Sequence, residues 1–166
     1  MKNRMKMLLF VVLLYLTVGT VFAVEQSHEI IVNIPQFIEL NLSQAAIEMG
    51  SFMDETGNLS NQLVTANPLN VSYRCNNSNG WTLTVSATDF LDDTNGNSFS
   101  VNQLMWGTDP LAINNTMPLT GDGSSTVATG TSPALQTIDV YYSVLYPENA
   151  YAGDYTSNVT YTLLAN

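Results

Sequence analysis

The sequence predicts an all-β fold built from antiparallel strands. Apolar and polar residues alternate in at least six short runs, which is the two-residue period of a strand and not the 3.6-residue period of a helix. Turn formers separate these runs: Asn79-Gly80, Asn95-Gly96, Gly121-Asp122-Gly123 and six prolines. Short strands joined in this way indicate a two-sheet antiparallel sandwich that is immunoglobulin-like in the broad sense.

Two alternating runs stand near the start, one on each side of Pro35. Each run places three aliphatic side chains on one face of a strand. These are Ile30, Val32 and Ile34 in residues 28–34, and Ile38, Leu40 and Leu42 in residues 37–42. The next stretch, residues 43–53, is the one segment able to carry a short helix, because it contains Ala45, Ala46, Ile47 and Met49.

Four later runs complete the predicted sheets: residues 69–73, 81–85, 138–146 and 155–164. In the second of them, Trp81, Leu83 and Val85 share one face and two threonines take the other. The last two are rich in the β-branched and aromatic side chains that suit a pleated surface. Residues 114–132 are poor in apolar side chains and rich in Gly, Ser and Thr, which predicts a long exposed connection.

The first 23 residues resemble a cleaved signal peptide. They combine a basic start, an apolar stretch and a small-x-small tripeptide: Lys2, Arg4 and Lys6; residues 7–16; and Val21, Phe22 and Ala23. An uncleaved membrane anchor is the alternative, but the apolar run is short for a spanning helix. We therefore predict one domain over residues 24–166, with no membrane span in the mature chain.

The mature chain is strongly acidic and contains no lysine. Arg74 is its one basic side chain against fourteen acidic ones, which is a formal net charge of −13. Such a chain repels nucleic acid and anionic lipid. The charge is compatible with bound divalent cations, with a basic partner, or with simple solubility outside the cell. We therefore expect a secreted protein, located at the cell surface or in the cell wall, with no nucleic-acid partner.

The sequence contains no recognisable catalytic constellation. It lacks a nucleophile elbow, a His-rich metal spacing and a phosphate-cradling glycine loop. Nothing pairs the carboxylates of Asp92, Asp93, Asp109 and Glu148 for glycoside hydrolysis. Cys75 is the one cysteine, so burial as a small hydrophobe and an intermolecular attachment are its two open fates. We predict a protein that is not an enzyme.

Residues 79–90 carry a resemblance to a known family. The run Asn79-Gly80-Trp81-Thr82-Leu83, continued to Asp89-Phe90, is similar to the first signature of the WxL family of bacterial cell-surface domains. The family's second signature should fall at Tyr161-Thr162-Leu163, where tyrosine replaces tryptophan. The resemblance implies noncovalent attachment to a Gram-positive envelope and a role in surface complexes. We predict core strands that bear these motifs at Trp81, Leu83, Val85, Tyr161 and Leu163.

Three aromatic side chains are candidates for a ligand platform: Trp106, Tyr146 and Tyr151. An exposed aromatic ring is able to stack on a sugar ring, whereas a buried one packs between sheets. Trp106 stands at the end of a strand that enters a turn, so both readings are open for it.

The acidic loop at residues 89–97 is a weak candidate for a calcium site. Asp89, Asp92, Asp93 and Asn95 supply the oxygen ligands that calcium prefers. Their spacing does not match the twelve-residue loop of helix-flanked calcium sites. A calcium site and a solvated hairpin loop therefore stay open as alternatives, and no other cofactor is expected.

The sequence predicts an exported, noncatalytic envelope protein with a structural or adhesive role, which docks on other surface proteins or on cell-wall polymer. One alternative is a pilin-like filament subunit, a homo-oligomer in which strand 25–34 completes a neighbour's sheet by β-strand addition. The reason is positional, since an alternating strand precedes Pro35 and stands apart from the rest. A carbohydrate-binding module is the other alternative.

Overall fold

The computed structural model describes residues 24–131 and 133–166. The described residues fall into two units, with residues 24–34 in the first and Pro35–Asn166 forming the second. The predicted signal peptide, residues 1–23, lies outside the described residues. The described part of the first unit, residues 24–34, forms no hydrogen-bonded strand. The strand predicted over residues 28–34 is thus absent as a paired element.

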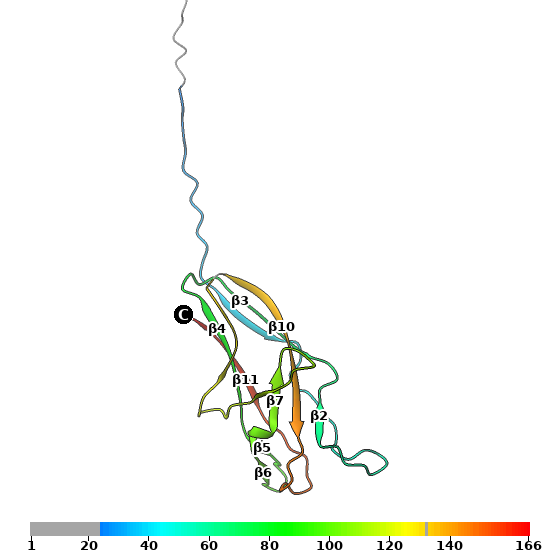
Figure 1. The fold of residues 1–166 in the computed structure, drawn as a ribbon. Helices are drawn as coiled ribbons and strands as arrows, with labels where there is room; N and C mark the ends of the chain where they lie inside the picture. The colour runs from blue at the N-terminus through cyan, green and yellow to red at the C-terminus, as the bar shows by residue number, and fades with distance from the viewer. Residues whose placement is uncertain (1–23, 132) are drawn as a thin grey trace, which may run out of the picture. The chain divides into compact units, whose positions relative to one another are not determined.

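The second unit is all-β, as predicted, and every ladder between its named strands is antiparallel. One sheet has the order β1-β3-β10-β7-β8, with β2 also paired to β10, and a second has the order β11-β4-β9 (Figure 1). The strands are β1 Ile38–Leu42, β2 Gln62–Val64, β3 Leu69–Cys75, β4 Trp81–Ala87, β5 Phe90–Leu91, β6 Ser98–Phe99, β7 Leu104–Gly107, β8 Asn115–Thr116, β9 Ser125–Gly130, β10 Ala134–Leu145 and β11 Val159–Ala165.

The core is formed by the alternate side chains of the central strands. In β3, Leu69, Val71, Tyr73 and Cys75 are buried, and in β4 the buried set includes Trp81, Leu83 and Val85. Both strands thus follow the two-residue period that predicted them. β10 is long enough to pair with β3 through Ala134–Val140 and with β7 and β2 through its second half.

Two local predictions were wrong. Residues 43–53 form no helix, and the short 3-10 turn η1 lies instead at Val101–Gln103. Ile47 and Met49 pack against the core from an irregular segment, so tertiary burial overrides helical propensity there. Residues 114–132 are not one exposed connection, because they contain β8, the fully buried Met117 and β9. The threonines and Val127 of β9 suit a strand once β4 supplies a partner.

Residues 24–131 and 133–166 contain no helix that is long and apolar enough to cross a membrane.

Candidate functional site

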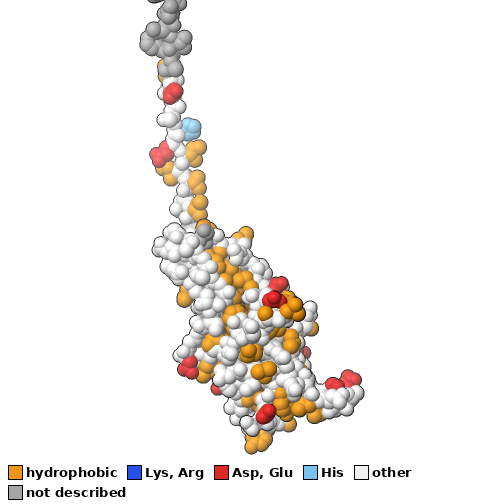
Figure 2. Space-filling model, viewed as in Figure 1, with side chains coloured by type: hydrophobic (Ala, Val, Ile, Leu, Met, Phe, Trp, Pro, Cys, Tyr) orange, Lys and Arg blue, Asp and Glu red, His pale blue; other side chains and the backbone are white. Residues whose placement is uncertain are grey.

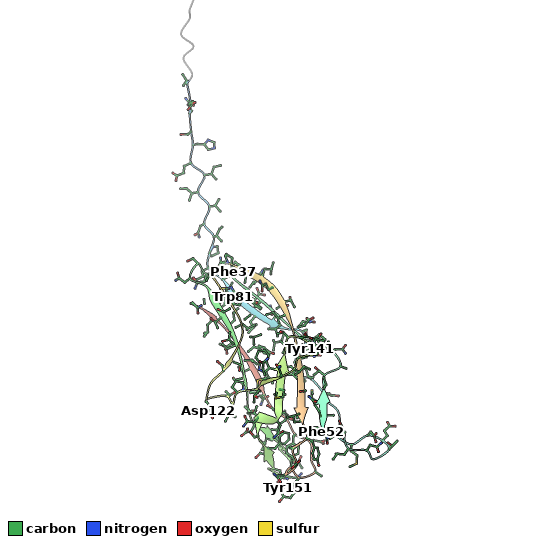
Figure 3. The ribbon with its side chains drawn as sticks, in the orientation of Figure 1. Phe37, Phe52, Trp81, Asp122, Tyr141 and Tyr151 are labelled. Atoms are coloured by element: carbon green, nitrogen blue, oxygen red, sulfur yellow. The ribbon has the colours of Figure 1, made fainter. Side chains whose placement is uncertain are left out.

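Among the described residues, the most exposed apolar segment is residues 24–34. Ile30, Val32 and Ile34 are 77%, 75% and 75% exposed, and Ile31 is 83% exposed. None of these eleven residues makes a hydrogen bond or ion pair within the described part of the chain. Figure 3 shows their side chains projecting from a stretched backbone. The segment therefore offers both an alternating apolar face and an unpaired backbone.

The second unit has two sheet edges that lie close to each other. β11 pairs with β4 on one side, and β1 pairs with β3 on one side. Within residues 35–131 and 133–166, no strand pairs with the outer edge of either. The two strands approach each other where the sheets meet (Figure 1). One side of the sandwich thus ends in two rows of unpaired backbone groups.

The apolar side chains at these edges are only partly covered. β1 directs Ile38, Leu40 and Leu42 to one face, and Leu40 packs against the core while Ile38 and Leu42 stay 48% and 43% exposed. β11 contributes Val159 and Leu163, both partly buried against the core. Figure 2 shows hydrophobic side chains exposed at several places on the visible face of the second unit. The core is therefore incomplete between β1 and β11.

β11 itself is firmly held to the core by a buried pair of tyrosines. The hydroxyl oxygens of Tyr142 in β10 and Tyr161 in β11 lie 2.6 Å apart in a hydrogen bond between the two sheets. Burial raises the pKa of Tyr142 to about 12 and also raises the pKa of Tyr161. Both hydroxyls therefore stay protonated at neutral pH, and the strand's inner face is fixed.

The motif residues Trp81, Leu83 and Val85 lie in β4 and are buried, and Tyr161 is buried in β11 while Leu163 is partly buried. The rings of Trp81 and Tyr73 pack with centroids 4.8 Å apart. These side chains connect the sheets and leave no ring open to a ligand.

The three platform candidates do not form one surface. Trp106 is 5% exposed and belongs to the core, so it has no ring face for a sugar, and the structure corrects that prediction. It is buried because β7 pairs with the central strand β10. Tyr146 is partly buried and packs edge-on against Phe52, with centroids 5.3 Å apart. Tyr151 is 74% exposed, toward the end of the unit that also carries Phe52 (Figure 3).

The carboxylates of the candidate calcium loop accept hydrogen bonds from the protein. Asp92 is almost fully buried and accepts from the side chain and backbone of Asn95 and from the backbone of Thr94. The Asn95 side-chain bond is the main reason that the pKa of Asp92 is lowered. Asp89 accepts from the backbone of Val101. Asp93 is exposed. Within the described residues, no group of three or more His, Cys, Asp or Glu side chains is placed to hold a metal ion.

Cys75 is fully buried in β3 with a free thiol. Burial removes the thiol from reach of a second chain while the protein is folded.

The alternating pattern of residues 28–34 is visible in the sequence, whereas the edge positions of β1 and β11 are not. The sequence predicts strands at residues 37–42 and 155–164, but it does not indicate that either strand lies at the edge of a sheet. Only the strand order makes both of them edges.

Comparisons with known proteins add little. No family model matches the sequence, and no curated protein matches it. Among solved structures, the chain is similar to one from a study of glycolipid glycan hydrolysis by a family 123 glycoside hydrolase from Clostridium perfringens. The sequence identity is 17% and the TM-score 0.39, with 76% of this chain and 24% of that chain covered. A likeness at this level carries no argument about activity.

Proposed function

We propose that this chain is an exported, noncatalytic subunit that assembles with copies of itself by β-strand addition. Residues 28–34 of one copy would pair with the outer edge of β11 in the next copy. The observation that supports this is the coexistence of an exposed, alternating apolar segment and an unpaired edge with partly exposed apolar side chains. Strand addition of this kind draws affinity from backbone hydrogen bonds and specificity from alternate side chains.

We also propose that the second unit is immunoglobulin-like. In that fold, strands A, B and E share one sheet, and strands C, F and G share the other. In chain order, β1, β3 and β10 take the places of A, B and E, while β4 and β11 take the places of C and F. The place of G is beside β11, and the described residues contain no strand there. A strand from a second copy would complete the sandwich at this position.

The chemistry of the two partners is complementary. Ile30, Val32 and Ile34 share one face of an extended strand, and Ile38 and Leu42 lie half exposed beside the vacant position. Removing an aliphatic side chain of this size from water contributes about 1.5–3 kcal/mol. Antiparallel pairing, which an immunoglobulin-like sheet requires, would set residue 34 near the start of β11 and residue 28 near its end.

Export, surface location and attachment to other surface proteins or wall polymer remain predictions from the sequence. They are compatible with self-assembly, since a polymer outside the cell is itself an envelope structure. The noncatalytic assignment likewise rests on the sequence.

The test is a deletion of residues 24–34, with the chain otherwise beginning at Pro35. We expect the chain beginning at Val24 to form oligomers or filaments in light scattering and electron microscopy. The deletion variant should be a folded monomer, because the core lies within the second unit.

A synthetic peptide of residues 24–35 supplies the complementary measurement. It should bind the deletion variant, and a peptide with the same composition in scrambled order should not. A deletion variant that still assembles would contradict the proposal. The proposal would also be contradicted if the peptide does not bind and the chain beginning at Val24 stays monomeric.

A further inference from the structure

Two shallow hollows on the second unit differ in whether their polar side chains are hydrogen-bonded to each other. The first lies on the outer face of β1, β3 and β10, and has a volume of about 400 Å³. Its polar groups are engaged with each other: Glu39 accepts from Asn41 and Arg74, Ser72 bonds Thr137, and Tyr73 donates to Gln136. A ligand there would have to break existing bonds.

The second hollow has a volume of about 500 Å³ and is lined by Asn61, Gln103, Leu145, Tyr146, Glu148 and Asn149. These residues come from the segment before β2, from η1, and from the end of β10 with the turn that follows. Within the described residues, the side chains of Asn61, Gln103, Glu148 and Asn149 make no hydrogen bond. Four exposed or partly exposed polar side chains thus line this hollow without a hydrogen bond to the other described residues.

The backbone around this hollow is held in place. The amide of Tyr146 donates to the carbonyl of Asn61 at 2.9 Å, and the amide of Ala150 donates to the carbonyl of Pro147 at 3.0 Å. The Tyr146 ring meets Phe52 at an interplanar angle of 79°. These contacts order part of the backbone that carries the lining residues, which lowers the backbone entropy lost when a ligand binds.

The charge and hydrogen-bonding groups of the lining residues favour one class of ligand. It contains no cation, and Arg74, the one basic side chain of the described residues, lines the other hollow. An anionic ligand therefore finds no counter-charge. One carboxylate is too few for a calcium ion, which takes six to eight oxygen ligands. Amide groups both donate and accept hydrogen bonds, as sugar hydroxyls do, and an aromatic wall suits the apolar face of a sugar ring.

We infer that this hollow is a binding site for a neutral glycan, with Asn61, Gln103 and Asn149 as hydrogen-bonding residues and Tyr146 as the aromatic wall. The volume lies within the range of about 300–1,000 Å³ that is usual for ligand pockets. The site lies on the β2–β10–η1 side and does not depend on the proposed assembly edge. A chain that both polymerises and binds glycan would be an adhesive surface polymer.

The test is calorimetric and NMR titration of the chain beginning at Val24, together with its Val32→Asp variant to keep a monomeric sample. The probes are tetrasaccharides of glucose, mannose, galactose and N-acetylglucosamine. Tetragalacturonic acid serves as the anionic probe, and a lysine-rich peptide as the basic probe. We expect at least one neutral tetrasaccharide to bind, with shifts centred on residues 145–149.

Gln103→Ala and Asn149→Ala should each weaken that binding by about tenfold, because each removes hydrogen bonds to the ligand. Asn41→Ala, in the other hollow, and Tyr151→Ala, an exposed ring outside the lining, should leave the affinity unchanged. Gln103→Ala and Asn149→Ala remove side chains that make no hydrogen bond within the described residues, and Asn41→Ala removes one exposed bond to Glu39, so all of these variants should fold normally.

Three results would overturn the inference. They are the absence of binding to any neutral probe, equal affinity in the Gln103→Ala and Asn149→Ala variants, and stronger binding of the anionic or basic probe. Loss of assembly in Val32→Asp with unchanged glycan affinity would separate this site from the proposed edge.

Discussion

The two outer strands of the three-stranded sheet, β9 and β11, both pair with β4, but they present very different edges. β11 follows β4 in continuous register from Val159 to Ala165. β9 slips in register, because Leu83 faces Ala128 and Thr84 faces Thr126, so Val127 is bulged out of the ladder. A bulge twists an edge and makes it a poor template for another strand.

This contrast makes β11, and not β9, the edge that is suited to pair with a further strand. β11 contains no proline, lysine or bulge along its seven residues, and these are the usual devices that protect an edge. An edge that is regular, unpaired and flanked by half-exposed aliphatic side chains is an aggregation hazard unless it has a specific partner. The partner that we propose is the segment at residues 28–34 of the same sequence, whose aliphatic side chains are exposed.

The largest effect is expected in the segment itself. Val32→Asp places a carboxylate on the face proposed to be buried, whereas Ile31→Asp places one on the opposite face. Because an unpaired buried charge is costly, the first variant should assemble at least about a hundredfold more weakly than the second. Light scattering over a concentration series checks this, and equal assembly of the two variants would break the comparison.

A second prediction concerns how firmly β11 is held. The pKa of Tyr142 is about 12 in the folded chain, against an ordinary value near 10 when unfolded. The raised pKa means that the folded state binds the Tyr142 proton more tightly than the unfolded state does. The contribution of this group to the free energy of unfolding is therefore complete below pH 10 and is lost as the pH rises toward 12. The loss from this group is about 3 kcal/mol.

Urea denaturation between pH 9 and pH 12 measures this loss. The double variant Tyr142→Phe, Tyr161→Phe is the control, because it removes both raised hydroxyls and should flatten the profile. A wild-type profile that is already flat over this range would mean that the tyrosine pair does not hold β11.

A third prediction tests the attachment of β9. A Cβ atom added at Gly130 would lie 2.8 Å from Cζ2 of Trp81, which is too close for a carbon–carbon contact. Gly130→Ala should therefore lower the free energy of unfolding by about 1–3 kcal/mol through overpacking. Thr126→Ala, an exposed change on the same strand, should stay within about 0.5 kcal/mol. Thermal denaturation distinguishes them, and a similar small effect for both would show that β9 is loosely packed.

The smallest effect is expected at β1. Leu42→Lys adds a charge beside the proposed position of the incoming strand, and its side chain is already 43% exposed. The variant should fold normally and bind the peptide of residues 24–35 about tenfold more weakly. Leu135→Lys, at a position that is 81% exposed in β10, is the matched control and should bind as the wild type does. Fluorescence anisotropy of a labelled peptide gives both values.

Much of the fold was accessible from the pattern of single strands. The runs at residues 37–42, 69–73 and 81–85 became β1, β3 and β4 because strict alternation has one favourable outcome, with the apolar face inward. β9 and Met117 were missed, because a strand of Ser, Thr and Gly gains its stability from the neighbour it pairs with. The sequence leaves Trp106 open as either an exposed or a buried ring, because the pattern of β7 does not indicate that the central strand β10 lies beside it.

The candidate site likewise has one part that the sequence reveals and one part that depends on the tertiary structure. The segment at residues 28–34 was readable, because alternation and a following proline are local features. The proposed acceptor edge of β11 was not readable, because an edge is a property of strand order. The same holds for the second hollow, where Asn61, Gln103 and Asn149 converge from three distant parts of the chain.

By itself, the sequence determined the all-β class, the acidic character of the chain and the faces of its clearest strands, since these depend on neighbouring residues and on composition. Only the tertiary structure decided which strands lie at the edges, which aromatic rings are buried and which polar side chains are left unused. These properties depend on pairing between residues far apart in the chain, and local alternation carries no information about the partner.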